Sequence, residues 1–281
     1  MIIALFVNEG KPCAKSLAVG VIEFLEHQQI QVVSGSPTID LPHLPLLSVI
    51  DPQTISYIIS LGGDGTILQL MHKHPELLDI PVLGINLGHL GFMADVPLSD
   101  LYPSLQALIS RDYTVDERII LSAETPNKKM SFALNEVVLH RNTNPHLIEI
   151  AIHVEETYVN TFEADGIIIA TPNGSTAYSL AAGGPILSPS LDALVVTPIS
   201  PHTISNRPIV LSADKEIQLQ YLSNGEPAEV RADGLESCLL QPGEMVRLSR
   251  FTKRFRLISL LRRDYFSTLR SKLGWAGKLR A

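Results

Sequence analysis

The sequence predicts an α/β N-terminal domain with a parallel, doubly wound sheet, followed by a β-rich C-terminal domain. Two observations support this fold class. Apolar runs of strand length alternate with helical patterns over about the first hundred residues, as in βαβ units. After about residue 112, short strand-like runs follow one another with few helices. We therefore expect an α/β domain over 1–100, a β-rich domain over 101–260 and a C-terminal helical segment over 261–281.

The elements of the first domain follow from their apolar patterns. Residues 2–7 are continuously apolar, as expected of a strand buried on both faces, and 14–27 carry apolar residues at helical spacing. A second short strand is expected at 30–35. Residues 51–74 read as a strand, a glycine turn and a helix, and 80–93 as a strand with a glycine-rich end. Ligands of such sheets bind outside the carboxyl ends of the strands, where both glycine-rich turns fall.

The second domain is predicted from short runs with strand character. These are 118–124, 132–140, 147–154, 157–171, 216–222 and 244–250. Residues 175–184 are the exception, because small residues with terminal glycines suit a short helix that stops there. Residues 265–275 predict a last helix.

Composition excludes several classes of function. The net charge is −7 and the one basic cluster, near the C-terminus, is modest, which disfavours a nucleic-acid partner. Cys13 and Cys238 are far apart in sequence, so neither a zinc pair nor a disulfide framework is expected, and a reducing, cytoplasmic setting fits. The apolar N-terminus has no basic segment before it, so we expect neither a signal peptide nor a membrane span.

The first glycine-rich turn places a carboxylate where a phosphate could bind. Its residues are Gly62, Gly63, Asp64, Gly65 and Thr66. The Walker pattern is excluded because no lysine follows at the required position. Either Asp64 or Thr66 caps the helix, or Asp64 does chemistry beside a phosphate that backbone amides and a metal hold. Three glycines favour the second interpretation, since they permit close approach to the backbone.

The second turn, 84–95, nearly spells the dinucleotide fingerprint. Asn86 stands where Gly-x-Gly-x-x-Gly requires its first glycine, so the standard fingerprint is not present. Asn86 either makes a turn with Gly88 or lines the same crevice as Asp64 and supports it.

The β-rich part offers polar residues in apolar surroundings. Asn135 and Glu136 lie within an apolar strand pattern, where they either grip sugar hydroxyls and a base edge or form a solvent-facing strand end. The hydroxyl-rich loop 171–176 leads into the short helix, and Tyr178 either stacks on an aromatic ring or packs at a domain interface. His140 and His146 lack the spacing of metal ligands, and no G-x-S-x-G hydrolase elbow occurs.

Taken together, these segments resemble the NAD kinase family. The matching blocks are GGDGT at 62–66, NLGHLGFMADV at 86–96, LNEVVLHR at 134–141, DGIIIATPNGSTAYSLAAGGPI at 165–186, SPHTISNRPIV at 200–210 and KLGW at 272–275. Phosphofructokinases and lipid kinases share a turn similar to GGDGT. The 171–185 block with Asn135 and Glu136 upstream is the specific signal.

The resemblance implies transfer of a phosphoryl group from ATP to the 2′-hydroxyl of the adenosine ribose of NAD, giving NADP, with a divalent metal, usually Mg²⁺. It makes Asp64 the general base, with the glycine amides and the metal managing the phosphate charge. It also implies that the C-terminal helix returns to the first domain, and that the chain forms a homodimer or homotetramer.

The resemblance also assigns the remaining site residues. The NAD-binding residues it implies are Asp64, Gly65, Asn135, Glu136, His146, Asp165, Thr176, Ala177, Tyr178 and Ser179. The ATP and phosphate turn is Gly62, Gly63, Gly65 and Thr66, with Asn86 in support. Three residues depart from the usual family pattern: Asn173 replaces Thr, Met93 replaces Leu, and Leu235 replaces Gln. Leu235 can neither donate nor accept a hydrogen bond, which removes any polar ligand contact there.

Two other functions fit parts of the pattern. A lipid or sugar kinase could use the same glycine turn, but it would have no use for the Asn135–Glu136 pair or for 175–179. A non-catalytic sensor could bind NAD or NADP, yet it would need no base at position 64. The sequence leaves open the range of donors, NAD against NADH, feedback by NADPH, and dimer against tetramer.

Overall fold

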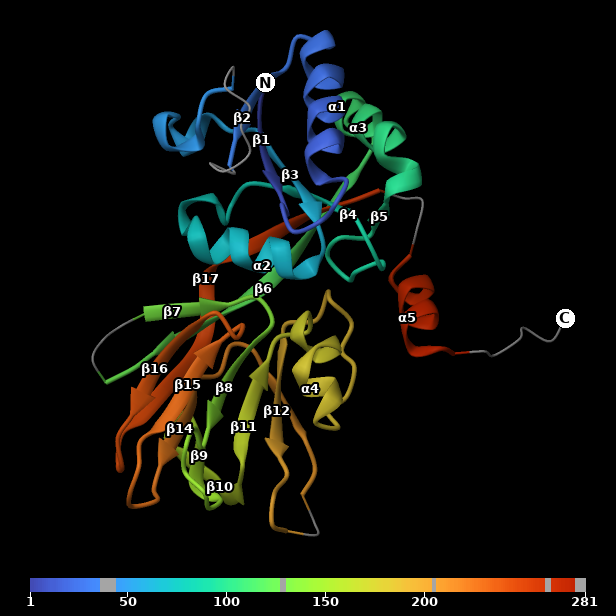
Figure 1. The fold of residues 1–281 in the computed structure, drawn as a ribbon. Coiled ribbons are helices and arrows are strands. Elements are labelled where there is room, and N and C mark those ends of the chain that lie inside the picture. The colour runs from blue at the N-terminus through green and yellow to red at the C-terminus, as the bar shows by residue number, and fades with distance from the viewer. Residues whose placement is uncertain (36–43, 127–129, 204–205, 261–263, 276–281) are drawn as a thin grey trace, which may run out of the picture. The chain divides into compact units, whose positions relative to one another are not determined.

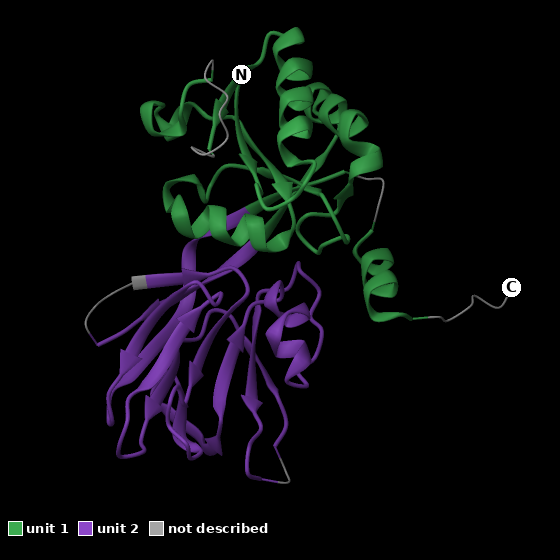
Figure 2. Ribbon diagram, in the orientation of Figure 1, with its two compact units in different colours: residues 1–117, 256–281 green, residues 118–255 purple. Residues whose placement is uncertain are grey.

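The computed structural model (Figure 1) describes residues 1–35, 44–126, 130–203, 206–260 and 264–275. The chain divides into two compact units, 1–117 with 256–281 and 118–255 (Figure 2). Residues 204–205 of the predicted 200–210 block lie outside the described residues. So do 261–263 and 276–281 of the predicted C-terminal segment.

The first unit is built on parallel strands in the order β4-β3-β1-β2. The strands are β1 (Ile2–Val7), β2 (Gln31–Ser34), β3 (Tyr57–Gly62), β4 (Val82–Asn86) and β5 (Val96–Pro97). The helices are α1 (Ala14–His27), α2 (Asp64–Lys73), α3 (Leu101–Ser110) and α5 (Tyr265–Leu273). Short 3-10 turns occupy Leu47–Val49, Pro52–Thr54, Pro75–Leu77 and Leu98–Asp100.

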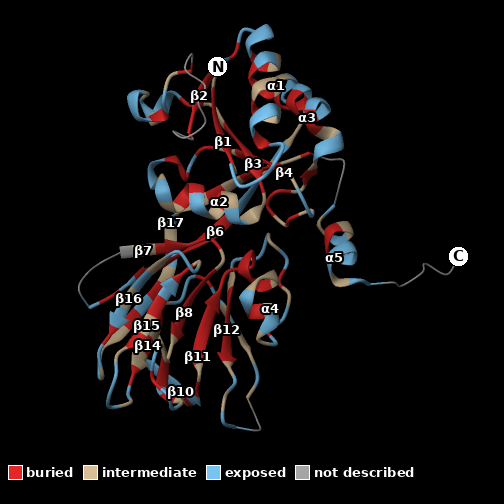
Figure 3. Cartoon of the chain, viewed as in Figure 1, coloured by how far each residue is buried: buried red, intermediate tan, exposed pale blue. Residues whose placement is uncertain are grey.

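Helices cover both faces of this sheet, which confirms the doubly wound α/β prediction. Leu5 of β1 shares a buried cluster with Val21 of α1 and Leu105 of α3, whereas Phe6 lies on the opposite face, where it lines a pocket with Leu70 of α2. Figure 3 shows the central strands buried between these helices. Helix α3 was not predicted, although Leu101, Leu105 and Leu108 recur at helical spacing; Pro103 is tolerated in its first turn, where the missing N–H would have no helical partner.

The second unit consists of antiparallel strands in two sheets. One sheet has the order β13-β12-β11-β8-β15-β16, and β10-β9-β14-β17 pair in the other. The strands that lie wholly within it are β7 (Met130–Ala133), β8 (Glu136–His140), β9 (Ile148–Val154), β10 (Thr157–Ala164), β11 (Gly166–Ala170), β12 (Ala193–Ile199), β13 (Ile209–Ser212), β14 (Ile217–Tyr221), β15 (Ala228–Ala232) and β16 (Glu236–Leu240). The long strands β6 (Thr114–Glu124) and β17 (Met245–Ser259) each have a few residues in the first unit. One buried cluster unites Ile150 and Leu219 of one sheet with Ile167 and Val230 of the other. The two sheets therefore pack face to face.

Two runs expected as single strands are divided in the structure. The run 132–140 ends as β7 at Ala133 and resumes as β8 at Glu136, so Asn135 precedes a strand rather than lying inside one. The run 157–171 is divided at Asp165, where the chain passes from β10 in one sheet to β11 in the other. Apolar residues continue on both sides of each break, and for that reason the sequence pattern did not reveal the breaks.

The loop after β11 forms the expected short helix. A 3-10 turn, Gly174–Thr176, precedes α4 (Tyr178–Ala181), and Gly183 follows with φ +89°. Among the described helices, none combines the length and apolar character needed to cross a bilayer.

Candidate active site

In the first unit, the glycine turn joins β3 to α2 without a side-chain N-cap. Gly63 is the N-cap residue, so neither Asp64 nor Thr66 caps the helix as one interpretation proposed. The Thr66 hydroxyl accepts hydrogen bonds from the backbone N–H of Gly63 and from Nδ2 of Asn8, each at 3.2 Å. A Cβ on Gly62 would overlap Thr66, whereas Cβ atoms on Gly63 and Gly65 would meet nothing within 4 Å. Gly62 therefore serves internal packing, and the other two leave the backbone open to a ligand.

The Asp64 carboxylate binds the backbone of the second glycine-rich turn. Oδ2 accepts the N–H of Phe92 at 2.8 Å, and Oδ1 accepts those of Met93 at 3.0 Å and Ala94 at 2.8 Å. A Cβ on Gly91 would overlap Oδ1, so only glycine fits beside the carboxylate. A carboxylate offers about four acceptor positions. Three are used here, which leaves room on Oδ2 for one further donor.

Asn86 shapes the same turn from inside. Its Nδ2 donates to the carbonyls of His89 at 2.6 Å and Ala94 at 3.3 Å, and its Oδ1 accepts the N–H of Gly88 at 2.6 Å. The side chain is buried. Asn86 and Asp64 thus bind the two sides of Ala94, and the structure brings these predicted residues together through the turn rather than through an open crevice.

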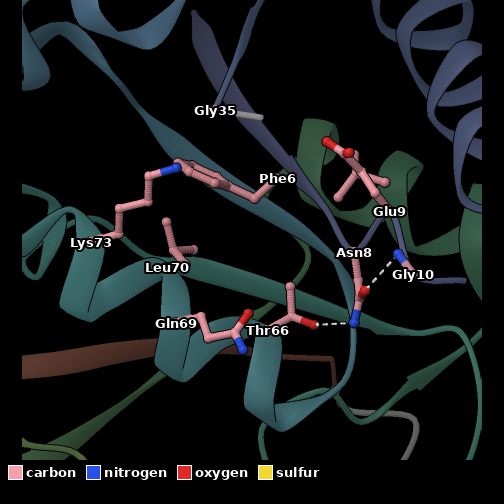
Figure 4. Close-up of a pocket in the computed structure, with 10 residues that line it drawn as sticks. Phe6, Asn8, Glu9, Gly10, Gly35, Thr66, Gln69, Leu70 and Lys73 are labelled. Atoms are coloured by element: carbon pink, nitrogen blue, oxygen red, sulfur yellow. Dashed lines mark hydrogen bonds between the residues drawn. The ribbon is translucent and has the colours of Figure 1, made fainter. Parts of the chain in front are cut away.

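Beside the first glycine turn lies a cavity of about 330 Å³ in the first unit. The residues that line it are Phe6, Val7, Asn8, Glu9, Gly10, Gly35, Thr66, Gln69, Leu70 and Lys73. Figure 4 shows Phe6 and Lys73 toward one end and Asn8 with Thr66 toward the other. A Cβ on Gly35 would overlap the Phe6 ring, so the ring can occupy this position only because residue 35 is glycine. The cavity joins an apolar, aromatic end to a polar end beside the glycine turn.

In the second unit, Asp233 repeats the arrangement of Asp64. Its Oδ2 accepts the N–H of Leu134 at 2.8 Å, and its Oδ1 accepts those of Asn135 at 2.8 Å and Glu136 at 3.1 Å. Asp233 lies in the turn after β15 with φ +49°. The carboxylate thus accepts the three hydrogen bonds that the carbonyl groups of a neighbouring strand would otherwise accept, and it holds Asn135 and Glu136 in place.

Glu136 is a buried carboxyl in a pocket of about 430 Å³. The pocket is lined by Glu136, Val138, His140, Asn142, Tyr178, Glu229, Arg231, Asp233 and Gly234. Burial raises the pKa of Glu136 to about 8, and the charge of Asp233 adds to the rise, while the backbone N–H of Tyr178 opposes it. Its Oε2 has no hydrogen-bond partner among the described residues. At neutral pH this carboxyl is mostly protonated, so it can donate a hydrogen bond to a ligand.

The side chain of Asn135 belongs to a polar chain. Nδ2 of Asn173 donates to its Oδ1 at 2.6 Å, and the guanidinium of Arg118 donates to Oδ1 of Asn173. Tyr178 is 42% exposed, and it lines the pocket with Glu136. Glu136 and Tyr178 place a carboxyl and an aromatic ring in one pocket, and the Asn135 amide belongs to the preceding residue of the chain; such groups suit a nucleoside.

The other predicted residues of this unit do not line the Glu136 pocket. Ser179 is buried and its hydroxyl is 2.9 Å from that of Thr197. Thr176 donates to the carbonyl of Asn173 at 3.0 Å. Asp165 forms an ion pair with Arg141 at 2.7 Å. It lies at the end of β11 that pairs with His140 of β8, and Glu136 is at the opposite end of β8.

Three further residues, His146, Ala177 and Leu235, line neither of the two pockets. His146 is exposed, and its backbone N–H is 3.4 Å from Oδ1 of Asn144. Ala177 precedes α4, and Leu235 is 45% exposed.

Comparison with known proteins identifies the family. The family models of the ATP-NAD kinase N-terminal and C-terminal domains match residues 3–113 and 134–260. Over 278 residues, the chain is 51% identical to the NAD kinase of Protochlamydia amoebophila, with 99% of each chain covered. This chain belongs to the NAD kinase family. The NAD kinase of Moorella thermoacetica is 34% identical to it over 280 residues, covering 98% of this chain and 90% of the relative.

Solved NAD kinase structures share the fold. Yeast NADH kinase complexed with NADH matches with a TM-score of 0.86 and 25% identity, covering 100% of this chain and 89% of that one. An NAD kinase from Archaeoglobus fulgidus in complex with ATP matches with a TM-score of 0.77 over 99% of this chain and 100% of that one; at 24% identity, it supports the fold alone.

The roles of Asp233, Asn173 and Arg118 were not predicted from the sequence. A signal for Asp233 was present, because Asp233-Gly234 repeats the Asp64-Gly65 pair. The same pair at Asp165-Gly166 forms an ion pair with Arg141 instead, so the dipeptide alone does not identify a backbone clamp. No local pattern marked Arg118, which lies 55 residues from its partner Asn173.

Proposed function

We propose that this chain catalyses phosphoryl transfer from ATP to the 2′-hydroxyl of the adenosine ribose of NAD, with Asp64 as the general base. The observation that carries this proposal is the Asp64 carboxylate, which three backbone N–H groups hold and which retains one acceptor position on Oδ2. A fixed carboxylate with one open position suits a single hydroxyl donor.

In the proposed reaction, Oδ2 of Asp64 takes the proton of the 2′-hydroxyl. The 2′-oxygen forms a bond to the γ-phosphorus of ATP, the bond from that phosphorus to the β,γ-bridging oxygen breaks, and ADP leaves. Such a transfer depends mainly on alignment and on stabilisation of charge. The open N–H groups at Gly63 and Gly65, at the start of α2, favour binding of the negative phosphate.

The proposed magnesium ion fits a site made mostly by the substrate. Among the described residues, no three His, Cys, Asp or Glu side chains converge on one point. Mg²⁺ commonly keeps several waters and binds substrate phosphates with only one or two carboxylates. Because one acceptor position remains on Asp64, that residue cannot be both base and metal ligand. The ion, when bound, would neutralise charge on the triphosphate, with ATP oxygens and water as its ligands.

We propose the cavity of the first unit as the donor pocket. Phe6 and Leu70 supply an apolar wall for a base, with Lys73 beside them, while Asn8, Thr66 and the glycine turn supply polar groups for phosphate (Figure 4). The family models that match this chain are those of ATP-NAD kinases, which supports ATP as the donor.

We propose the Glu136 pocket of the second unit for the NAD molecule. The protonated carboxyl of Glu136 and the amide of Asn135 would bind polar atoms of the adenosine, and the exposed ring of Tyr178 would stack on a base. The remaining family positions, His146, Asp165, Thr176, Ala177 and Ser179, stay in the proposed set on the family resemblance alone. The same holds for a homodimer or homotetramer in the cytoplasm, which light scattering and localisation would test.

A panel of donors and acceptors tests the proposed activity. Purified protein with Mg²⁺ is mixed with ATP, another nucleoside triphosphate or polyphosphate, and with NAD, NADH, a diacylglycerol or a sugar. We expect NADP from NAD and ATP. A phosphorylated lipid or sugar without NADP would favour the other kinase class. NAD binding with no product under any donor would favour a sensor.

A further inference from the structure

We infer that Arg118 and Asn173 form a polarity relay that turns the amide N–H groups of Asn135 toward the ligand, so that the ligand must supply a hydrogen-bond acceptor there. Asn173 is then a positioning residue that sets specificity. The ligand part of this inference rests on the proposed binding of NAD by Asn135, whereas the relay itself does not.

Each link of the relay follows from the chemistry of the one before. Arg118 is 7% exposed, and a guanidinium can only donate. Asn173, also 7% exposed, must therefore present Oδ1 to Arg118, which leaves Nδ2 as the group that faces Asn135. Because Nδ2 can only donate, Asn135 must present Oδ1 to it, and the distance is 2.6 Å. A permanently charged side chain thus decides the orientation of two amides.

The main chain of Asn135 is fixed as well. Its N–H donates to Asp233 at 2.8 Å and its carbonyl accepts the N–H of Thr171 at 2.8 Å. The backbone and Oδ1 of Asn135 are thus engaged within the protein. Its Nδ2 has no hydrogen-bond partner among the described residues, so it is the polar group of Asn135 that is left to bind a ligand. A ring nitrogen, hydroxyl oxygen or carbonyl of a nucleoside would satisfy it. An N–H donor would leave two donors opposed, which is unfavourable in a partly buried position.

The relay also gives a role to a departure from the usual family pattern. A threonine at position 173 can accept from Arg118 through its oxygen and donate through its hydroxyl hydrogen, so Asn and Thr transmit the same polarity. An aspartate at position 173 would not transmit this polarity. Asp is nearly the same size as Asn but only accepts, so Asn135 would have to rotate, donate to it, and turn Oδ1 toward the ligand.

The test compares N173D with N173T and with N160D. Asn160 is exposed on β10, so N160D adds the same charge to the same unit away from the relay. The first readout is solvent exchange of the side-chain amide of Asn135, followed by NMR on asparagine-labelled protein. We expect fast exchange in the wild type, N173T and N160D, and slowed exchange in N173D. Unchanged exchange in N173D would overturn the relay, with or without any NAD binding.

The second readout is steady-state kinetics with NAD. We expect N173D to raise KM for NAD about 10- to 100-fold, as for a buried hydrogen bond replaced by a mismatch, with kcat changed less than about threefold. The KM of N173T for NAD should be close to that of the wild type and well below that of N173D. A KM in N173D equal to that of the wild type, or an equal loss in N173T, would overturn the specificity role. Absence of NADP formation in the wild type would instead overturn the proposed function, while the exchange measurement still decides the relay.

Discussion

The carboxylate of Asp64 accepts the backbone N–H of Ala94 at 2.8 Å, across thirty residues of sequence. Through this contact and its neighbours, the two glycine-rich turns of the first unit become one structure. Asp233 does the same for Leu134 through Glu136 in the second unit. Each proposed substrate-binding segment is therefore held by an aspartate that binds three consecutive N–H groups, a charge-assisted arrangement stronger than three neutral contacts.

Gly91→Ala tests the contact between Asp64 and the second turn without removing the carboxylate. The new Cβ would overlap Oδ1, so either the turn or Asp64 must move. We expect kcat to fall on the order of 10- to 100-fold, because small displacements of a reacting group are costly. Gly88→Ala is the matched control, since a Cβ there meets only ordinary contacts, the nearest at 3.6 Å. Equal activity of the two variants would show that the Asp64 position does not limit the rate.

Asp233→Asn tests the second backbone clamp. The variant places an NH₂ group against a backbone N–H, so we expect a loss of about 1 to 3 kcal/mol in the free energy of unfolding and a rise of roughly tenfold in KM for NAD. KM for ATP should not change. Asp214→Asn, in an exposed turn before β14, controls for the loss of one charge. A KM for NAD unchanged in Asp233→Asn would contradict the positioning role.

Glu136 predicts a pH dependence of stability. Its pKa is about 8 in the folded protein and 4.5 ordinarily, so between these values the folded state holds a proton that the unfolded state has released. The free energy of unfolding therefore falls by an amount on the order of a few kcal/mol as the pH rises from about 4.5 to about 8. Above pH 8 this contribution levels off. Glu136→Gln, which mimics the protonated form, should lack this slope. Denaturant unfolding of both proteins at pH 5, 6.5 and 8.5 measures it, and parallel curves would refute the assignment.

Lys73→Ala tests the donor pocket. Figure 4 shows Lys73 beside Phe6 at one end of the cavity. Loss of the ammonium and its stem should raise KM for ATP roughly three- to tenfold through lost contacts to the nucleoside, and leave KM for NAD unchanged. Lys15→Ala, on the exposed side of α1, is the control. If Lys73→Ala instead raised KM for NAD alone, this cavity would not be the donor site.

The sequence predicted the elements whose pattern is local. The apolar run of β1, the helical spacing of α1 and the glycine turn between β3 and α2 all appear where expected, because neighbouring residues determine them. Helix α3 was missed although its apolar residues Leu101, Leu105 and Leu108 have helical spacing.

The contacts that build the candidate site could not be predicted in the same way. Asp233 binds Asn135 across 98 residues, and Arg118 reaches Asn173 across 55. Such pairs exist only after the strands have paired. The break between β7 and β8 has the same origin, since the N–H groups at 134–136 bind a carboxylate from another turn.

The role of Asp64 as the base is tested most directly by the rate and position of phosphorylation in the wild type and in Asp64→Asn. NAD, ATP and Mg²⁺ are incubated with each protein, and the dinucleotide product is quantified and its phosphate located by ³¹P NMR. We predict one NADP per ADP, with the phosphate on the 2′-oxygen of the adenosine ribose, and a rate in Asp64→Asn lower by a factor of about 10² to 10⁴, while the variant remains folded and still binds NAD. A folded Asp64→Asn protein that forms NADP at the wild-type rate would contradict the role of Asp64 as the general base.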